Sequence, residues 1–204
     1  KVAHERGLPI IVDAAAQLPP KSNLTDIYAM GADLVVFSGG KGLRGPQCTG
    51  IVIGRSELVR ACSLNSSPNS AIGRSMKVGK EELAGILTAI ELFMVQDEEE
   101  LLIKWEDRCS IMCDALTDIN GVTIDYLPSN RNPEGGAHAP ASPVINIHFS
   151  PNAKLSADDT KEELERADPP IAVEVQQSTM IIGPMGLEDG QAEIVGKCIG
   201  DILI

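Results

Sequence analysis

The sequence places a lysine in a setting that suits chemistry better than a flexible turn. Lys41 is flanked by Gly40 and Gly42, and apolar runs at 34–37 and 51–53 lie on either side of this turn. The pattern predicts strand, loop and strand, with the amine fixed in space by two buried strands. In such a half-buried, glycine-lined setting, desolvation activates a lysine as a nucleophile toward carbonyl carbons.

A carboxylate is the second residue of interest. The apolar run 10–12 ends at Asp13, and three alanines, residues 14–16, follow it. A continuous apolar run predicts a strand that is covered on both faces. A carboxylate at the carboxyl end of a parallel strand lies at the sheet edge where open α/β sheets bind ligands. The sequence is equally compatible with Asp13 capping the next turn or helix.

The elements between these two residues bring them to one sheet edge. A short helix over 25–30 separates the strand at 10–12 from the strand at 33–37. Strand, helix and strand in this spacing form a βαβ unit, which predicts parallel strands that are neighbours or near-neighbours. Asp13 and Lys41 are therefore expected at the same edge of one sheet.

The expected helix over 25–30 has ordinary signals at both ends. Asn23 or Thr25 could supply the N-cap oxygen, and Gly31 the stop. We therefore expect structural roles for these three residues.

The glycines around the lysine also match a nucleotide-binding pattern by letter. Gly40, Gly42 and Gly45 fit G-x-G-x-x-G, but Pro46 and a strand follow where a dinucleotide fold needs a helix. A dinucleotide site is therefore not predicted.

A pair of cations follows a polar loop over 65–73. Arg74 and Lys77 lie just before the next helix, and two cations beside a flexible loop suit an anionic group of a substrate. A solvated helix entry is the alternative interpretation.

The remaining chain predicts two long helices and then an α+β layer. The helices cover 81–95 and about 98–118, and a Pro/Gly-rich loop covers 128–143. Further strands and helices are expected at 122–126, 144–149, 156–166, 171–175, 180–182 and 188–203. We expect three parts: the remainder of a large domain (1–95), a linking helix (96–118) and a small C-terminal α+β domain (119–204).

The composition limits which partners and which kinds of site are expected. The net charge of −12 and the isoelectric point near 4.6 disfavour nucleic acid and anionic membrane surfaces as partners. The five cysteines have no paired spacing, which predicts reduced thiols and a cytoplasmic protein. Cys109 and Cys113 are one helical turn apart without further ligands nearby, so we expect core cysteines and no metal site.

The beginning of the chain gives a further expectation. It opens at Lys1 without an initiator methionine, and its first residues resemble a helix end that runs into a strand. We therefore expect that the first part of a longer protein precedes it.

Three stretches carry a resemblance to a known family. They are IVDAAAQLPP, GADLVVFSGGKGLRGPQCTGIVIGR and IGRSMKVGKEELAGILTAIELF. Together they resemble fold-type-I pyridoxal-phosphate-dependent enzymes, in the branch of bacterial selenocysteine synthase (seryl-tRNA selenium transferase) and the ammonia-lyases of amino-sugar acid phosphates. The resemblance is dense from about residue 8 to residue 95. It implies an α/β fold with the C-terminal part of a large, mainly parallel-sheet domain.

The resemblance also implies roles for individual residues. Lys41 would form a Schiff base with pyridoxal phosphate and move the α-proton of the substrate, and Asp13 would pair with the pyridine nitrogen. Ala15 would pack on the ring, Gln17 would contact the ring hydroxyl, and Ser38 would contact the cofactor phosphate or the loop backbone. The cationic pair Arg74 and Lys77 falls where this branch carries cations near its active site.

The activity implied is α,β-elimination of the ammonia-lyase type, or β-replacement, on a small amino acid. Alternatives are selenium transfer to seryl-tRNA, an aminotransferase or desulfurase activity, and a truncated paralogue without catalysis. A homo-oligomer is implied, since fold-type-I active sites usually lie at a subunit interface. The family's phosphate-binding loop would precede the strand that ends at Asp13, so this chain alone is expected to bind the cofactor weakly.

Overall fold

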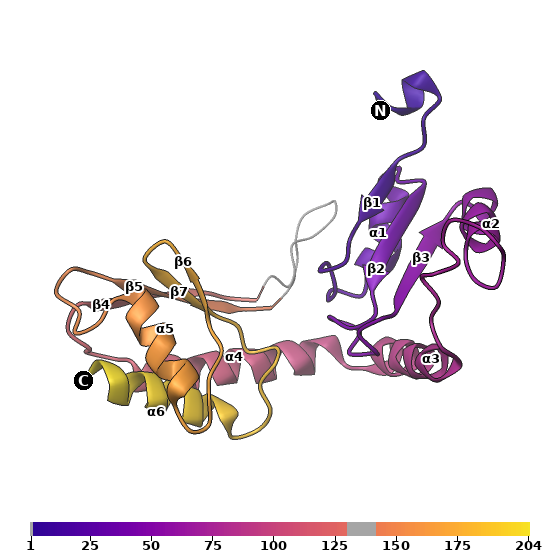
Figure 1. Cartoon of the computed structure of the whole chain (residues 1–204). Coiled ribbons are helices and arrows are strands. Elements are labelled where there is room, and N and C mark those ends of the chain that lie inside the picture. Colours follow the sequence, from indigo (N-terminus) through magenta and orange to yellow (C-terminus); the bar gives the residue numbers. More distant parts are fainter. Residues whose placement is uncertain (1, 130–141) are drawn as a thin grey trace. The chain divides into compact units, whose positions relative to one another are not determined.

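The computed structural model describes residues 2–129 and 142–204 and divides into two compact units (Figure 1). The first unit ends at Glu98 and the second begins at Glu99. Each unit has its own cluster of buried apolar side chains. Most of the loop predicted over 128–143 lies outside the described residues.

The first unit contains a three-stranded sheet in the order β1-β2-β3 (Figure 1). Strands β1 (Ile11–Asp13) and β2 (Leu34–Ser38) are parallel neighbours, as the βαβ spacing predicts. Strand β3 (Gly50–Gly54) pairs with β2 in the antiparallel sense, because residues 39–49 join the two as a hairpin loop. The lysine loop is thus held between two hydrogen-bonded strands.

One face of this sheet packs on helices. Helix α1 (Asn23–Ala29) contributes Ile27 and helix α3 (Lys80–Val95) contributes Ile86 to a cluster with Val35 and Phe37 of β2. The 3-10 turn His4–Arg6 precedes the sheet, and helix α2 (Ser56–Asn65) follows β3. The buried side chains of α3, which recur with the helical period, therefore pack in one core with the alternating buried side chains of β2.

The other face of the sheet is only partly covered, since Leu34 of β2 is buried on it while side chains of β1 and β3 are exposed. The registers of β1, β2 and β3 place Ile11, Val36 and Val52 on the face opposite to Val35. Ile11 is 65% exposed and Val52 is 40% exposed. The prediction that β1 is covered on both faces is therefore wrong for this chain, because β1 is an edge strand with one uncovered face.

The second unit is an antiparallel sheet with helices. The sheet has the order β4-β5-β7-β6, which gives an α+β layer with antiparallel pairing throughout. Its strands are β4 (Val122–Leu127), β5 (Val144–Phe149), β6 (Glu174–Gln176) and β7 (Thr179–Ile182). Its helices are α4 (Glu98–Ala115), α5 (Ala157–Arg166) and α6 (Gln191–Leu203).

The core of this unit joins the sheet to all three helices. Ile147 of β5, Leu164 of α5 and Ile199 of α6 are all fully buried in it. Cys109 of α4 is also fully buried there, which confirms a core cysteine, and burial raises the pKa of its thiol to about 12. A Cβ on Gly196 of α6 would lie 2.9 Å from a methyl group of α4, so these two helices approach closely.

Several element boundaries differ from the sequence prediction by a few residues, and two of these differences have a visible cause. The strand expected over 171–175 is shorter, because the N–H of Ile171 bonds to the carbonyl of Leu164 at 2.9 Å instead of to a strand. Helix α6 begins at Gln191, after Gly190 with φ of 85°, and not at residue 188. Within the described residues, no helix is both long enough and apolar enough to cross a membrane.

Candidate active site

The carboxyl ends of β1 and β2 form the edge where the chemically interesting residues gather. Because these strands run in parallel, both end on the same side of the sheet. Asp13 is the last residue of β1 and pairs in register with Val36, and β2 continues to Ser38. Lys41 follows in the loop that leads to β3. The register also places the side chains of Asp13 and Ser38 on the partly covered face of the sheet.

The carboxylate of Asp13 has one oxygen in use. Its Oδ1 accepts a hydrogen bond from the backbone N–H of Ala15 at 3.0 Å, which closes the turn after β1. The turn-capping interpretation of Asp13 is therefore met. Among the described residues, Oδ2 has no hydrogen-bond partner, and the side chain is exposed. One carboxylate oxygen therefore remains available to a ligand.

Hydrogen bonds across the loop fix the backbone around Lys41. The N–H of Gly45 donates to the carbonyl of Gly39 at 2.7 Å, and the side-chain amide of Gln47 donates to the carbonyl of Gly40 at 3.0 Å. Gly40 directly precedes Lys41, so Gln47 holds the peptide that carries the lysine. The expected half-buried setting is wrong for the side chain itself, which is exposed because it points out from a loop at the sheet edge.

The amine of Lys41 has no partner among the described residues, in hydrogen bonds or ion pairs. An amine held by a fixed backbone but free at its tip is suited to reaction with a carbonyl group.

The turn after β1 and the lysine loop touch through Gly42. A Cβ on Gly42 would lie 2.1 Å from the carbonyl oxygen of Leu18, so only glycine permits this approach. Leu18 and Leu43 are both buried beside this contact. The segment that carries Asp13 and the loop that carries Lys41 are therefore packed directly on each other.

A buried amide, which the sequence does not mark as functional, holds this turn. The Nδ2 group of Asn23 donates to the carbonyl of Gln17 at 2.7 Å, and Asn23 is fully buried. The predicted capping role of Asn23 or Thr25 is wrong: Asn23 is the first helical residue and turns back to the preceding turn, while the Thr25 hydroxyl donates to the carbonyl of Ser22. Residue type alone gives no sign of this difference, since burial decides it.

The remaining predicted residues differ in how closely they join this edge. Ala15 and Gln17 are half-buried in the turn after β1, and the N–H of Gln17 donates to the carbonyl of Ala14 at 3.0 Å. Arg74 and Lys77 are exposed, and a guanidinium N–H of Arg74 donates to the hydroxyl of Ser67 at 3.1 Å, within its own loop. The substrate-binding role of this pair stays a prediction.

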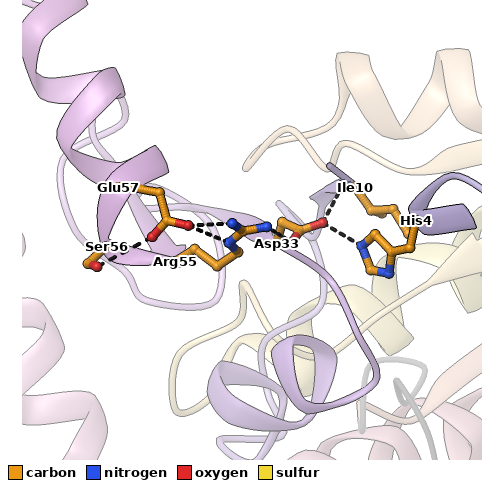
Figure 2. A network of polar contacts seen from close by, with 6 residues as sticks. All are labelled: His4, Ile10, Asp33, Arg55, Ser56 and Glu57. Carbon is orange, nitrogen blue, oxygen red and sulfur yellow. Dashed lines mark hydrogen bonds and ion pairs between the residues drawn. The ribbon is translucent and has the colours of Figure 1, made fainter. Parts of the chain in front are cut away.

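The opposite edge of the same sheet holds an ionic network (Figure 2). The buried carboxylate of Asp33 lies 2.7 Å from His4 Nε2 and accepts hydrogen bonds from the N–H of Ile10 at 2.7 Å and from Arg55 at 2.9 Å. These contacts hold the pKa of Asp33 well below its usual range. Arg55 also pairs with Glu57. Because these charged groups pair with one another, we assign this edge a role in stabilising the fold.

Comparisons with known proteins place this geometry in context. The Aminotransferase class-V family matches residues 1–72. A 5'-C-glycyluridine monooxygenase-decarboxylase of a Streptomyces species is 38% identical over 122 residues, which are 60% of this chain and 29% of that protein. The D-glucosaminate-6-phosphate ammonia lyase of Salmonella typhimurium is 38% identical over 91 residues, 45% of this chain and 22% of that protein.

A third relative aligns with nearly all of the chain. The L-seryl-tRNA(Sec) selenium transferase of Solidesulfovibrio magneticus is 26% identical over 219 aligned positions, 95% of this chain and 45% of that protein. The solved structure of a D-glucosaminate-6-phosphate ammonia-lyase superimposes with a TM-score of 0.69 at 23% identity, over 99% of this chain and 52% of that one. The chain has the fold-type-I fold of pyridoxal-phosphate-dependent enzymes. Its sequence is similar to selenium transferases and to an ammonia lyase among those enzymes, and it spans about half or less of the length of these relatives.

These relationships imply pyridoxal phosphate as the cofactor, and the edge described above fits that group. The free amine of Lys41 can hold the cofactor aldehyde, and the free oxygen of Asp13 can accept a hydrogen bond from a protonated ring nitrogen. Ala15, two residues after Asp13, has a small side chain against which a flat ring could pack. The donor set, the glycine-lined loop and the small residues are thus mutually consistent.

Proposed function

We propose that this chain is part of a pyridoxal-phosphate-dependent enzyme that catalyses α,β-elimination of the ammonia-lyase type, or β-replacement, on an amino acid. The observation that carries the proposal is the shared edge of β1 and β2. An exposed carboxylate and an amine without a partner in the described part of the chain emerge there from packed segments.

The proposed roles follow from what each side chain offers. Lys41 would hold the cofactor covalently and then take the α-proton of the substrate at its Nζ. Asp13 would accept a hydrogen bond at the ring nitrogen through the oxygen that Ala15 leaves free. Bound pyridoxal phosphate supplies an electron-withdrawing ring that stabilises negative charge at the α-carbon. Gln17 and Ser38 would contact the ring hydroxyl and the phosphate.

Two exposed cations and the net charge of the chain support the proposed class of substrate. Arg74 and Lys77 would bind an anionic group of the substrate, as exposed cations can when the loop that bears them closes over a ligand. The net charge of −12 favours a small amino acid over a tRNA. Selenium transfer to seryl-tRNA is the second candidate, because the selenium transferase aligns with 95% of the chain.

Reductive trapping tests the role of Lys41. The chain is incubated with pyridoxal phosphate and borohydride, and the adduct is mapped by peptide mass spectrometry. We expect selective label on Lys41, loss of that label in Lys41→Ala, and no change in a control variant of the exposed Lys80, whose side chain is 90% exposed. Label spread evenly over the exposed lysines would overturn the proposal and favour a non-catalytic paralogue.

The reaction type is tested in the longest native form of the protein with β-chloroalanine as the probe. Elimination converts one β-chloroalanine and one water into pyruvate, ammonium, chloride and one proton, which is read as pyruvate and ammonia in equal amounts. Transfer of the amino group to a keto acid without chloride release would instead favour an aminotransferase. A salt-sensitive mobility shift with seryl-tRNA would favour selenium transfer.

We further propose a cytoplasmic homo-oligomer. Helix α3 carries exposed apolar side chains in addition to its buried face, among them Leu83, Leu87 and Met94, which are 52%, 63% and 54% exposed. Apolar side chains that gather on one element support association with another protein surface. Sedimentation at several concentrations tests this, and a monomer at every concentration would contradict it.

A further inference from the structure

We propose that Asn23 is a positioning residue for Lys41, because its buried amide fixes the turn on which the lysine loop rests. The inference deepens the proposed function and rests on it where the cofactor is concerned. It links Asn23 to Lys41 through two contacts that are both within the first unit.

The first contact is the hydrogen bond from Asn23 to the backbone. Asn23 has no solvent exposure, and its Nδ2 group lies 2.7 Å from the carbonyl oxygen of Gln17. A buried amide that loses its partner costs more than a neutral hydrogen bond contributes, so this pair is strongly fixed. The N–H of Asn23 also donates to the carbonyl of Pro20 at 3.2 Å. Asn23 therefore closes the turn between β1 and α1 at two points.

The second contact passes the position of this turn to the lysine loop. Leu18 follows Gln17, and its carbonyl oxygen would lie 2.1 Å from a Cβ on Gly42 and its carbonyl carbon 2.7 Å from the same point. Backbone thus lies on backbone, without a flexible side chain between them. A displacement of the turn must move Gly42, and with it the neighbouring Lys41.

We expect the lysine loop to move as a rigid unit when the turn moves. The bond from Gly45 to Gly39 and the bond from Gln47 to Gly40 hold its two sides together. The turn that Asn23 fixes also begins directly after Asp13, whose oxygen is tied to Ala15. Asn23 therefore sets the separation between the carboxylate and the amine without touching either of them.

The test compares two variants on the same helix. Asn23→Leu keeps a similar side-chain volume and removes the donor, whereas Thr25→Ala removes an exposed hydroxyl that bonds the carbonyl of Ser22. Two quantities are measured on the whole chain. They are the amide hydrogen exchange of the peptide that covers 39–45 and the pyridoxal phosphate concentration that gives half-maximal borohydride trapping at Lys41, with Lys80 as an internal reference.

In Asn23→Leu, we expect the rate of amide hydrogen exchange in 39–45 to rise about fivefold, as loss of one net hydrogen bond implies. The pyridoxal phosphate concentration that gives half-maximal trapping at Lys41 should rise by the same factor. Trapping at Lys80 and exchange in β2 should not change. Equal values for Asn23→Leu and Thr25→Ala would overturn the inference. If the native chain shows no selective label on Lys41, the proposed function fails, and exchange in 39–45 then decides alone. Should Asn23→Leu unfold, Asn23→Ala is judged by the same criteria.

Discussion

The replacement of Gly42 by alanine is the sharpest test of the contact between the two segments. The new Cβ would lie 2.1 Å from the carbonyl oxygen of Leu18, far inside the distance of about 3.5 Å at which such atoms attract each other. The clash meets backbone, and the turn behind it is held by Asn23, so neither side can yield cheaply. Overpacking of this kind costs about 1–3 kcal/mol. We therefore expect Gly42→Ala to destabilise the first unit by an amount in this range.

The assay is amide hydrogen exchange of β2 and β3, read as the free energy of opening. A control for the substitution itself is Gly186→Ala in the second unit, because a Cβ on Gly186 would meet nothing within 4 Å. Gly42→Ala should also weaken trapping of pyridoxal phosphate at Lys41. If Gly42→Ala and Gly186→Ala differ in opening free energy by less than about 0.5 kcal/mol, the close packing of turn and loop is refuted.

Three further predictions concern stability and reactivity. The pKa of Asp33 is depressed, so its contribution to stability is present above the unfolded pKa of about 3.9 and is lost as the pH falls toward the folded value. Urea midpoints should thus show Asp33→Asn less stable than the native chain at pH 7, by a margin that shrinks below pH 4. Burial raises the pKa of Cys109 to about 12, so iodoacetamide at pH 8 should label the exposed Cys48 first, as mass spectrometry would show. Leu164→Ala should cost the second unit about 2–5 kcal/mol, read by the fluorescence of the buried Trp105 of α4; an unchanged midpoint would contradict the core assignment.

The parts of the fold that follow a period could be predicted from the sequence. The βαβ spacing predicted that β1 and β2 are parallel, and the structure confirms it. The element expected over 156–166 is likewise confirmed as helix α5, and its N-cap Ser156 accepts a hydrogen bond from the N–H of Asp159 at 3.1 Å. Such features depend on residues close in sequence or on a regular repeat.

The parts that failed depend on burial and on contacts between distant segments. Lys41 was expected to be half-buried, but a hairpin loop at an open sheet edge leaves its side chain in solvent. Asn23 was expected to cap a helix, but its side-chain amide is buried and donates to the carbonyl of Gln17 instead. The approach of Gly42 to Leu18 cannot be found from spacing, because it arises only when two turns pack.

The two edges of the three-stranded sheet differ in a way that matters for engineering. Asp33 and Arg55 compensate each other at one edge, whereas at the other edge Lys41 and one oxygen of Asp13 have no partner within residues 2–129 and 142–204. Proteins often sacrifice stability where they need reactivity, and they recover it elsewhere. Substitutions that reinforce the Asp33 edge should therefore raise the melting temperature without a cost in turnover. That edge is the place where a thermostable variant, or a crystallisable one, can be sought.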